Sequence, residues 1–157
     1  MREHYIAVVG PSAGSPAEHV LADEVGKLIA KAGCVLVCGG MGGVMEAAAS
    51  GCIEAGGKAV GILPTETRLE ANPYLTIAVA TGMGEARNAI VIRTADVVIA
   101  INGGYGTLSE IALALKMGKP VVGLGTWELA KAGKPVEAIV LARDAADAVA
   151  KAIALIR

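Results

Sequence analysis

Short apolar runs alternate with stretches of helical periodicity along most of the chain. A run without polar positions, bounded by glycine, proline or polar residues, predicts a strand buried on both faces of a sheet. Such strands are expected at Tyr5 to Val9, Cys34 to Cys38, Lys58 to Leu63, Leu75 to Ala80, Asp96 to Ile101, Val121 to Leu124 and Val136 to Ala142. Helices are expected at Ala17 to Ala32, Val44 to Ala55, Glu85 to Thr94, Ile111 to Lys116 and, capped by Asp144, up to Ile156. Thr65 to Tyr74 predicts an ordered surface loop, whereas residues 126–133 fit neither pattern.

The alternation of strand and helix with short connections is typical of an α/β protein. We therefore predict a single-domain, doubly wound (Rossmann-like) parallel sheet over residues 1–157, with helices on both faces. Composition agrees, because 54% of the residues are hydrophobic while only 3% are aromatic and phenylalanine is absent. Such a core must be built from valine, isoleucine, leucine and alanine, as in parallel sheets.

Composition and charge also exclude several classes of function. No apolar run is long enough to span a membrane, and the first residues lead directly into a strand, so we expect a cytoplasmic protein without a signal peptide. The net charge is −1 without a basic cluster, which argues against nucleic-acid binding. Cys34, Cys38 and Cys52 are expected to be buried small hydrophobic residues, and with only two histidines the chain offers no metal site.

In sheets of this kind, ligands bind beyond the carboxyl ends of the strands. Four loops lie there in the predicted fold, namely Gly10 to Gly14, Gly39 to Gly43, Thr81 to Arg87 and Asn102 to Thr107. The last loop is the most informative, because its glycines allow close approach to a ligand and the following helix start offers free N–H groups to a phosphate. Glu110 follows within a turn, and as a poor anion ligand it either caps the helix or acts on the bound molecule.

Several nucleotide and hydrolase motifs fail in this sequence. No Gly-Lys pair is followed by serine or threonine, and neither glycine-rich loop completes G-x-G-x-x-G. Ser12 lies in a G-x-S-x-G loop, but the only histidine after it is His19, which leaves Ser12 as a hydroxyl donor to a ligand or as part of a turn. We expect ligand binding at the loop that contains Gly39, Gly40, Gly43 and Met45, since plain connection does not need so many glycines. Arg87 offers a fork of donors at the same edge.

Taken in order, three motifs resemble the LOG (Lonely Guy) family, which older descriptions call "lysine decarboxylase-like". The motifs are Gly39-Gly40 through Gly43 and Met45, then Arg87, then Gly103-Gly104-x-Gly106-Thr107-x-x-Glu110. Characterised LOG proteins are phosphoribohydrolases that split a nucleoside 5′-monophosphate into free base and ribose 5-phosphate. The resemblance implies that Arg87 and Glu110 are catalytic, that the glycines and Thr107 hold the phosphate, and that no cofactor or metal is required.

The chain departs from the LOG pattern at three positions. Asn102 replaces the proline before the glycine loop, Asn88 replaces the lysine after the arginine, and Glu46 replaces a glycine. In these features it resembles a branch similar to the molybdenum-cofactor carrier proteins of algae, which bind a phosphorylated pterin. Hydrolysis of a nucleoside monophosphate and non-catalytic binding of a phosphorylated ligand such as molybdenum cofactor therefore both remain open. A third open function is a nucleotide-sensing module that acts on a partner protein. The resemblance and the alanine-, valine- and isoleucine-rich helices also predict a homodimer or homotetramer.

Overall fold

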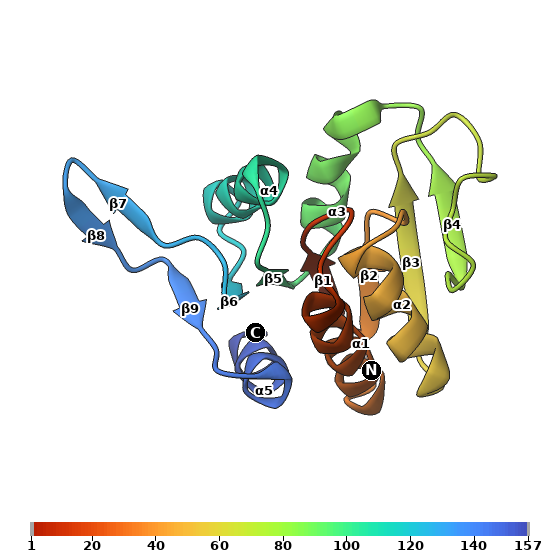
Figure 1. The fold of residues 1–157 in the computed structure, drawn as a ribbon, viewed down its shortest axis with the longest axis horizontal. Helices are drawn as coiled ribbons and strands as arrows, with labels where there is room; N and C mark the ends of the chain where they lie inside the picture. Colours follow the sequence, from red (N-terminus) through yellow and green to blue (C-terminus); the bar gives the residue numbers. More distant parts are fainter. Residues whose placement is uncertain (1, 157) are drawn as a thin grey trace.

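A seven-stranded parallel sheet forms the centre of residues 2–156, which the computed structural model describes (Figure 1). Its strand order is β4-β3-β2-β1-β5-β6-β9, and all neighbouring pairs are parallel. The strands are β1 (Tyr5–Val9), β2 (Val35–Cys38), β3 (Lys58–Leu63), β4 (Ile77–Ala80), β5 (Val97–Ile101), β6 (Val121–Leu124) and β9 (Ile139–Leu141). The predicted α/β, Rossmann-like class is confirmed.

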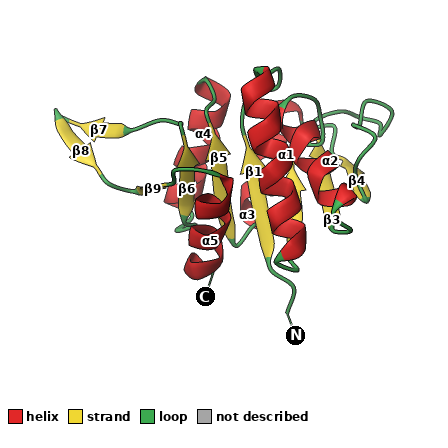
Figure 2. Cartoon of the chain, turned by 60° about the horizontal axis from the view of Figure 1, so that its bottom comes forward, coloured by secondary structure: helices red, strands yellow, loops and turns green. Residues whose placement is uncertain are grey.

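Helices cover both faces of this sheet (Figure 2). The helices α1 (Pro16–Lys31), α2 (Val44–Glu54) and α5 (Ala145–Leu155) pack on one face, and α3 (Asn88–Thr94) and α4 (Tyr105–Lys116) pack on the other. Alternate residues of β1 point to opposite faces of the sheet. Ile6 and Val8 pack in the core under α1, and Ala7 and Val9 pack in the core under α3. The expected aliphatic core is therefore split by the sheet into two apolar layers.

The segment that fitted neither pattern forms a two-stranded antiparallel ribbon, β7 (Leu129–Lys131) and β8 (Lys134–Val136), that projects from the sheet (Figure 1). Its tip is a two-residue turn in which Ala132 and Gly133 both have positive φ, at 51° and 79°. This is the geometry that tight hairpins prefer, but only the glycine signals it in the sequence. The strand expected from Val136 to Ala142 is divided accordingly, since Val136 ends β8 and only Ile139–Leu141 joins the sheet.

Helix α4 begins at Tyr105 rather than at the expected Ile111, so Gly106, Thr107 and Glu110 lie within the helix. The expected helix from Glu85 also differs, because a 3₁₀ turn, η1 (Gly84–Arg87), precedes α3. Asp144 caps α5 as predicted, accepting a hydrogen bond from the Asp147 N–H at 2.8 Å. Within the described residues no helix is long and apolar enough to cross a membrane. The homodimer or homotetramer stays a prediction.

Two glycines let α1 and α2 pack at backbone contact. A Cβ atom at Gly26 would lie 2.0 Å from the Ala48 carbonyl oxygen, and one at Gly51 would lie 2.0 Å from the Asp23 carbonyl oxygen. Neither position leaves space for a methyl group, so the close pairing of these helices depends on both glycines. This contact also sets the place of α2, which begins directly after the glycine loop at the carboxyl end of β2.

Replacing Gly26 by alanine tests this packing, because the sign of the effect is opposite to intrinsic helix propensity. Alanine is favoured over glycine inside a helix by about 1 kcal/mol. We expect Gly26→Ala instead to lower the free energy of unfolding by about 1–3 kcal/mol, since the methyl group overpacks the interface. Urea denaturation measures the change. Gly106→Ala in α4, where a Cβ atom meets nothing within 4 Å, is the matched control and should be neutral or stabilising. Equal effects of the two substitutions would contradict the packing argument.

Candidate functional site

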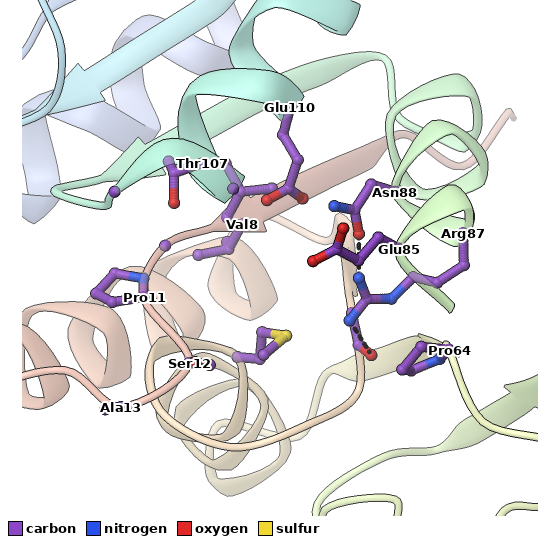
Figure 3. A pocket seen from close by; sticks show the side chains of 16 residues that line it. Val8, Pro11, Ser12, Ala13, Pro64, Glu85, Arg87, Asn88, Thr107 and Glu110 are labelled. Atoms are coloured by element: carbon purple, nitrogen blue, oxygen red, sulfur yellow. Dashed lines mark hydrogen bonds between the residues drawn. The ribbon is translucent and has the colours of Figure 1, made fainter. Parts of the chain in front are cut away.

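The carboxyl ends of the strands surround a cavity of about 480 Å³ (Figure 3). This volume is within the range of roughly 300–1,000 Å³ typical of small-molecule sites. Five segments contribute to it, namely those that follow β1, β2, β3, β4 and β5. The lining residues are Val8, Val9, Gly10, Pro11, Ser12, Ala13, Gly39, Met45, Pro64, Glu85, Arg87, Asn88, Gly104, Gly106, Thr107 and Glu110.

The position of the cavity follows from the topology. From β1 the chain moves outward through β2, β3 and β4, and then returns to β5 on the other side of β1. A place where the strand order reverses in this way is a topological switch point. The connection after β1 and the connection after β5 leave the sheet in different directions there, which opens a crevice between the two strands. The loops after these two strands line the cavity, with Gly10 and Pro11 on one side and Gly104 and Gly106 on the other.

The start of α4 carries three glycines, which have different surroundings. Gly103 is required by the fold, because its φ is 100° and a Cβ atom there would lie 2.2 Å from the Thr107 Oγ1 atom. Gly104, the N-cap, and Gly106 both have negative φ, and a Cβ atom at either would meet nothing within 4 Å. Their missing side chains leave room in the cavity rather than in the core. The free N–H groups and positive dipole end of a twelve-residue helix lie here, which favours an anion.

Arg87 is held against the opposite wall by oxygen atoms of three segments. Its Nε donates to the Ile62 carbonyl at 2.9 Å, its Nη2 donates to the Gly39 carbonyl at 3.4 Å, and its Nη1 donates to the Asn88 side chain. Gly39 makes this possible, since a Cβ atom there would lie 2.6 Å from both the Arg87 Nη2 atom and the Met45 sulfur. The guanidinium is therefore fixed in place before any ligand binds.

Glu110 faces the cavity from the second turn of α4 (Figure 3). Burial raises the pKa of its carboxyl group to about 7, and the Arg87 charge opposes this rise only in part. Burial also lowers the pKa of Arg87, against the influence of Glu110. Within residues 2–156 no ion pair joins the two side chains. The guanidinium is bound by carbonyl oxygens and by Asn88 instead, and Arg87 acts on Glu110 only through its charge.

The structure brings most of the proposed site residues together. Arg87, Glu110, Ser12, Gly39, Met45, Gly104, Gly106 and Thr107 line the cavity, whereas Gly40, Gly43 and Gly103 do not. The last three shape the loops instead. A Cβ atom at Gly40 would lie 2.7 Å from Leu63, and one at Gly43 would lie 2.4 Å from the Pro11 carbonyl oxygen. The roles of the lining residues in binding stay predictions.

Sequence reasoning missed Glu85 and Pro64 as lining residues and noted Asn88 only as a departure from a motif. Glu85 lies within the η1 turn and Asn88 directly follows it, and Figure 3 shows both side chains directed toward the cavity. Their nearness to a proposed site residue was the only available signal. Pro64 directly follows β3. A proline at this place is explained by the end of the strand, so the sequence gives no sign that it also lines a cavity.

The cysteines are buried, as expected, and unpaired. Burial raises the pKa of the Cys38 and Cys52 thiols to about 11, so both remain protonated at neutral pH. Among the residues that the structure describes, no three histidine, cysteine, aspartate or glutamate side chains are grouped so that they could hold a metal ion. The polar groups at the cavity are the helix start, the guanidinium and the neighbouring side chains.

Comparisons with known proteins agree on one family. The family model described as "SLOG cluster4 family" matches residues 3–151. An uncharacterized protein of Archaeoglobus fulgidus is 47% identical over 124 residues, which cover 79% of this chain and 82% of that protein. The structure of the molybdenum cofactor binding protein from Rippkaea orientalis is 38% identical with a TM-score of 0.92, covering 100% of this chain and 99% of that chain. The molybdenum cofactor carrier protein of Chlamydomonas reinhardtii is 38% identical with a TM-score of 0.88, covering 98% of both chains.

The raised pKa of Glu110 predicts how stability depends on pH. Folding raises this pKa from about 4.5 to about 7, so the folded chain binds the proton more tightly than the unfolded chain. The resulting stabilisation is complete below pH 4.5 and is lost as the pH rises through 7, by up to roughly 3 kcal/mol. Urea denaturation of the wild type and of Glu110→Gln between pH 4.5 and 8 measures it.

We expect the stability of Glu110→Gln to fall less with rising pH, because the amide does not titrate. Glu24→Gln, at an exposed position of α1, removes the same charge and should keep the wild-type slope. Parallel curves for the wild type and Glu110→Gln would show that the Glu110 pKa is not raised by folding.

Proposed function

We propose that this chain, which belongs to the SLOG cluster4 family, binds a phosphorylated pterin of the molybdenum-cofactor type without hydrolysing it. The arrangement of Gly104 and Gly106 carries this proposal. Neither a neighbouring atom nor a positive φ requires glycine at either position, yet both lie at the start of α4 and both leave space in the cavity. Main-chain N–H groups at such a helix start suit a phosphate ester.

The other wall of the cavity supports the same ligand. The guanidinium of Arg87 is fixed by Gly39, Ile62 and Asn88, and an arginine held in this way presents a preorganised positive charge to an anion. Asn88, Glu85 and Ser12 add amide, carboxyl and hydroxyl groups around the same space. A heterocycle rich in donors and acceptors, joined to a phosphate, would find partners for both parts.

The comparisons favour binding over catalysis. Proteins described as molybdenum cofactor binding or carrier proteins match nearly the whole length of this chain at 38% identity. The state of Glu110 agrees with this view. With a pKa of about 7, the carboxyl group is partly protonated at neutral pH and then repels an anionic ligand less than a carboxylate does. In its neutral form it also donates a hydrogen bond.

Filling the space at Gly106 tests the binding proposal. We expect Gly106→Val to fold normally and to lower the affinity for molybdenum cofactor at least about tenfold, which corresponds to ~1.4 kcal/mol. The protein is loaded with cofactor released from a molybdenum enzyme, and retention is measured by transfer to the apo-enzyme. Ala112→Val, at an exposed position on the same helix, is the matched control and should retain the cofactor as the wild type does. Absence of cofactor retention by the wild type would overturn the proposal.

Hydrolysis of a nucleoside 5′-monophosphate is the second candidate function, and one observation favours it. Arg87 and Glu110 line the same cavity, and a carboxyl group with a pKa of about 7 suits general acid–base work. Breaking an N-glycosidic bond builds positive charge on the ribose, which an ionised Glu110 would stabilise.

A base-release assay with the common nucleoside monophosphates separates the two functions. If the chain is a binding protein, we expect no release of base above the rate of a no-protein control. Release of base that disappears in Glu110→Gln, while that variant still binds the nucleotide, would establish hydrolysis and contradict the binding proposal. Thermal unfolding of the variant checks that a lost activity does not reflect a lost fold.

A further inference from the structure

We propose that the first turn of α1 positions the ligand site by holding the two loops that face each other across the cavity. This inference rests on the proposed function for the identity of the ligand. Glu18 and His19 are neighbours in that turn, and neither lines the cavity. Glu18 binds the loop that leads into α4, and His19 binds the loop that follows β1. Both loops are therefore anchored to one rigid helical turn.

Glu18 is itself fixed by a capping box. The Ser15 side chain accepts a hydrogen bond from the Glu18 N–H at 3.2 Å, and Glu18 Oε2 accepts one from the Ser15 N–H at 3.3 Å. The other carboxylate oxygen, Oε1, accepts a hydrogen bond from Asn102 Nδ2 at 2.6 Å. The same carboxylate thus closes the helix end and reaches a residue 84 positions away in the chain.

Asn102 needs such support, because its φ of 46° lies in the left-handed region. Two further hydrogen bonds hold Asn102: its N–H donates to the Leu124 carbonyl at 2.9 Å, and its carbonyl accepts from Thr126 Oγ1 at 2.6 Å. Next to it, the Gly104 carbonyl accepts a hydrogen bond from Trp127 Nε1 at 3.0 Å. A proline here would lose the N–H and could not adopt this φ. Asn102 and Glu18 therefore set the direction in which Gly103 and Gly104 leave β5.

His19 acts on the facing loop. Its Nε2 donates to the Ala13 carbonyl at 2.6 Å, and Ala13 and Ser12 line the cavity. The imidazole sits against Gly14, where a Cβ atom would lie 2.9 Å from Nε2 and where φ is 76°. Because the two anchoring residues are adjacent, a change in one contact alters the spacing between the Ser12 loop and the Gly104 loop. We therefore assign Glu18, His19 and Asn102 as positioning residues that act through these loops.

A charge-preserving exchange tests the contact between Glu18 and Asn102. Asn102→Asp places two carboxyl groups against each other and removes the hydrogen bond, while aspartate still tolerates positive φ. Adding Glu18→Gln restores a hydrogen bond of reversed polarity, because the glutamine amide donates to the new carboxylate and its oxygen still accepts from Ser15. The control double variant, Asn102→Asp with Glu24→Gln, has the same net charge but leaves the contact broken.

Two measurements are made on each variant. In the unliganded protein, we expect amide hydrogen exchange of residues 102–107 to be about tenfold faster in Asn102→Asp and in the control double variant, and to return to wild type in the exchange variant. We expect the affinity for molybdenum cofactor to fall about tenfold in Asn102→Asp and in the control double variant, and to return to the wild-type value in the exchange variant. The unfolding midpoint should stay near that of the wild type.

The inference is overturned if Asn102→Asp leaves loop exchange unchanged, or if Glu24→Gln restores the site as well as Glu18→Gln does. The exchange measurement needs no ligand, so it judges the positioning contact even if the wild type fails to bind molybdenum cofactor. That failure alone would overturn the proposed function and not the contact.

Discussion

The reversal of strand order between β1 and β5 is the constraint on which the rest of the site depends. It separates the loops after these strands, and a cavity lies between them. The backbones around the space must still come close to each other, and glycines allow it. A Cβ atom at Gly10 would lie 2.8 Å from the Ile101 carbonyl oxygen, and one at Gly43 would lie 2.4 Å from the Pro11 carbonyl oxygen. The crevice is therefore topological in origin, and its narrow shape comes from these contacts.

Two groups of glycines in this chain serve separate purposes, and the distinction bears on function. Those at 26, 51, 39 and 103 are required by neighbouring protein atoms, since any side chain would collide with backbone or with a fixed side chain. Gly104 and Gly106 collide with nothing, and the space that they leave open faces the candidate ligand. Glycine in a helix start costs conformational entropy, so a bound anion that needs close backbone approach gives these two positions a reason that the fold alone does not supply.

The cavity contains a positively charged group in a fixed position, Arg87, and a carboxyl group that can change its protonation state near neutral pH, Glu110. Arg87 is bound by carbonyl oxygens and by Asn88, so its charge stays in place whatever the state of Glu110. Glu110 has no direct ion pair with Arg87. Burial disfavours the charged form of its carboxyl group and raises its pKa to about 7. A site of this kind can accommodate an anionic ligand by taking up a proton, and the same property would serve acid–base chemistry. Catalysis would also require a ligand with an N-glycosidic bond that the site can hydrolyse.

The sequence by itself determined the seven strands of the parallel sheet, the five helices and the four loops at the carboxyl edge, because hydrophobic periodicity and glycine or proline boundaries are local signals. It also singled out Arg87, Glu110 and Gly106, which the fold places around one cavity. Only the tertiary structure decided the early start of α4 at Tyr105, the hairpin around Ala132, and the contact between Glu18 and Asn102. These features depend on partners far away in the chain. The same holds for the pKa of Glu110, because desolvation is produced by atoms that separate segments bring together.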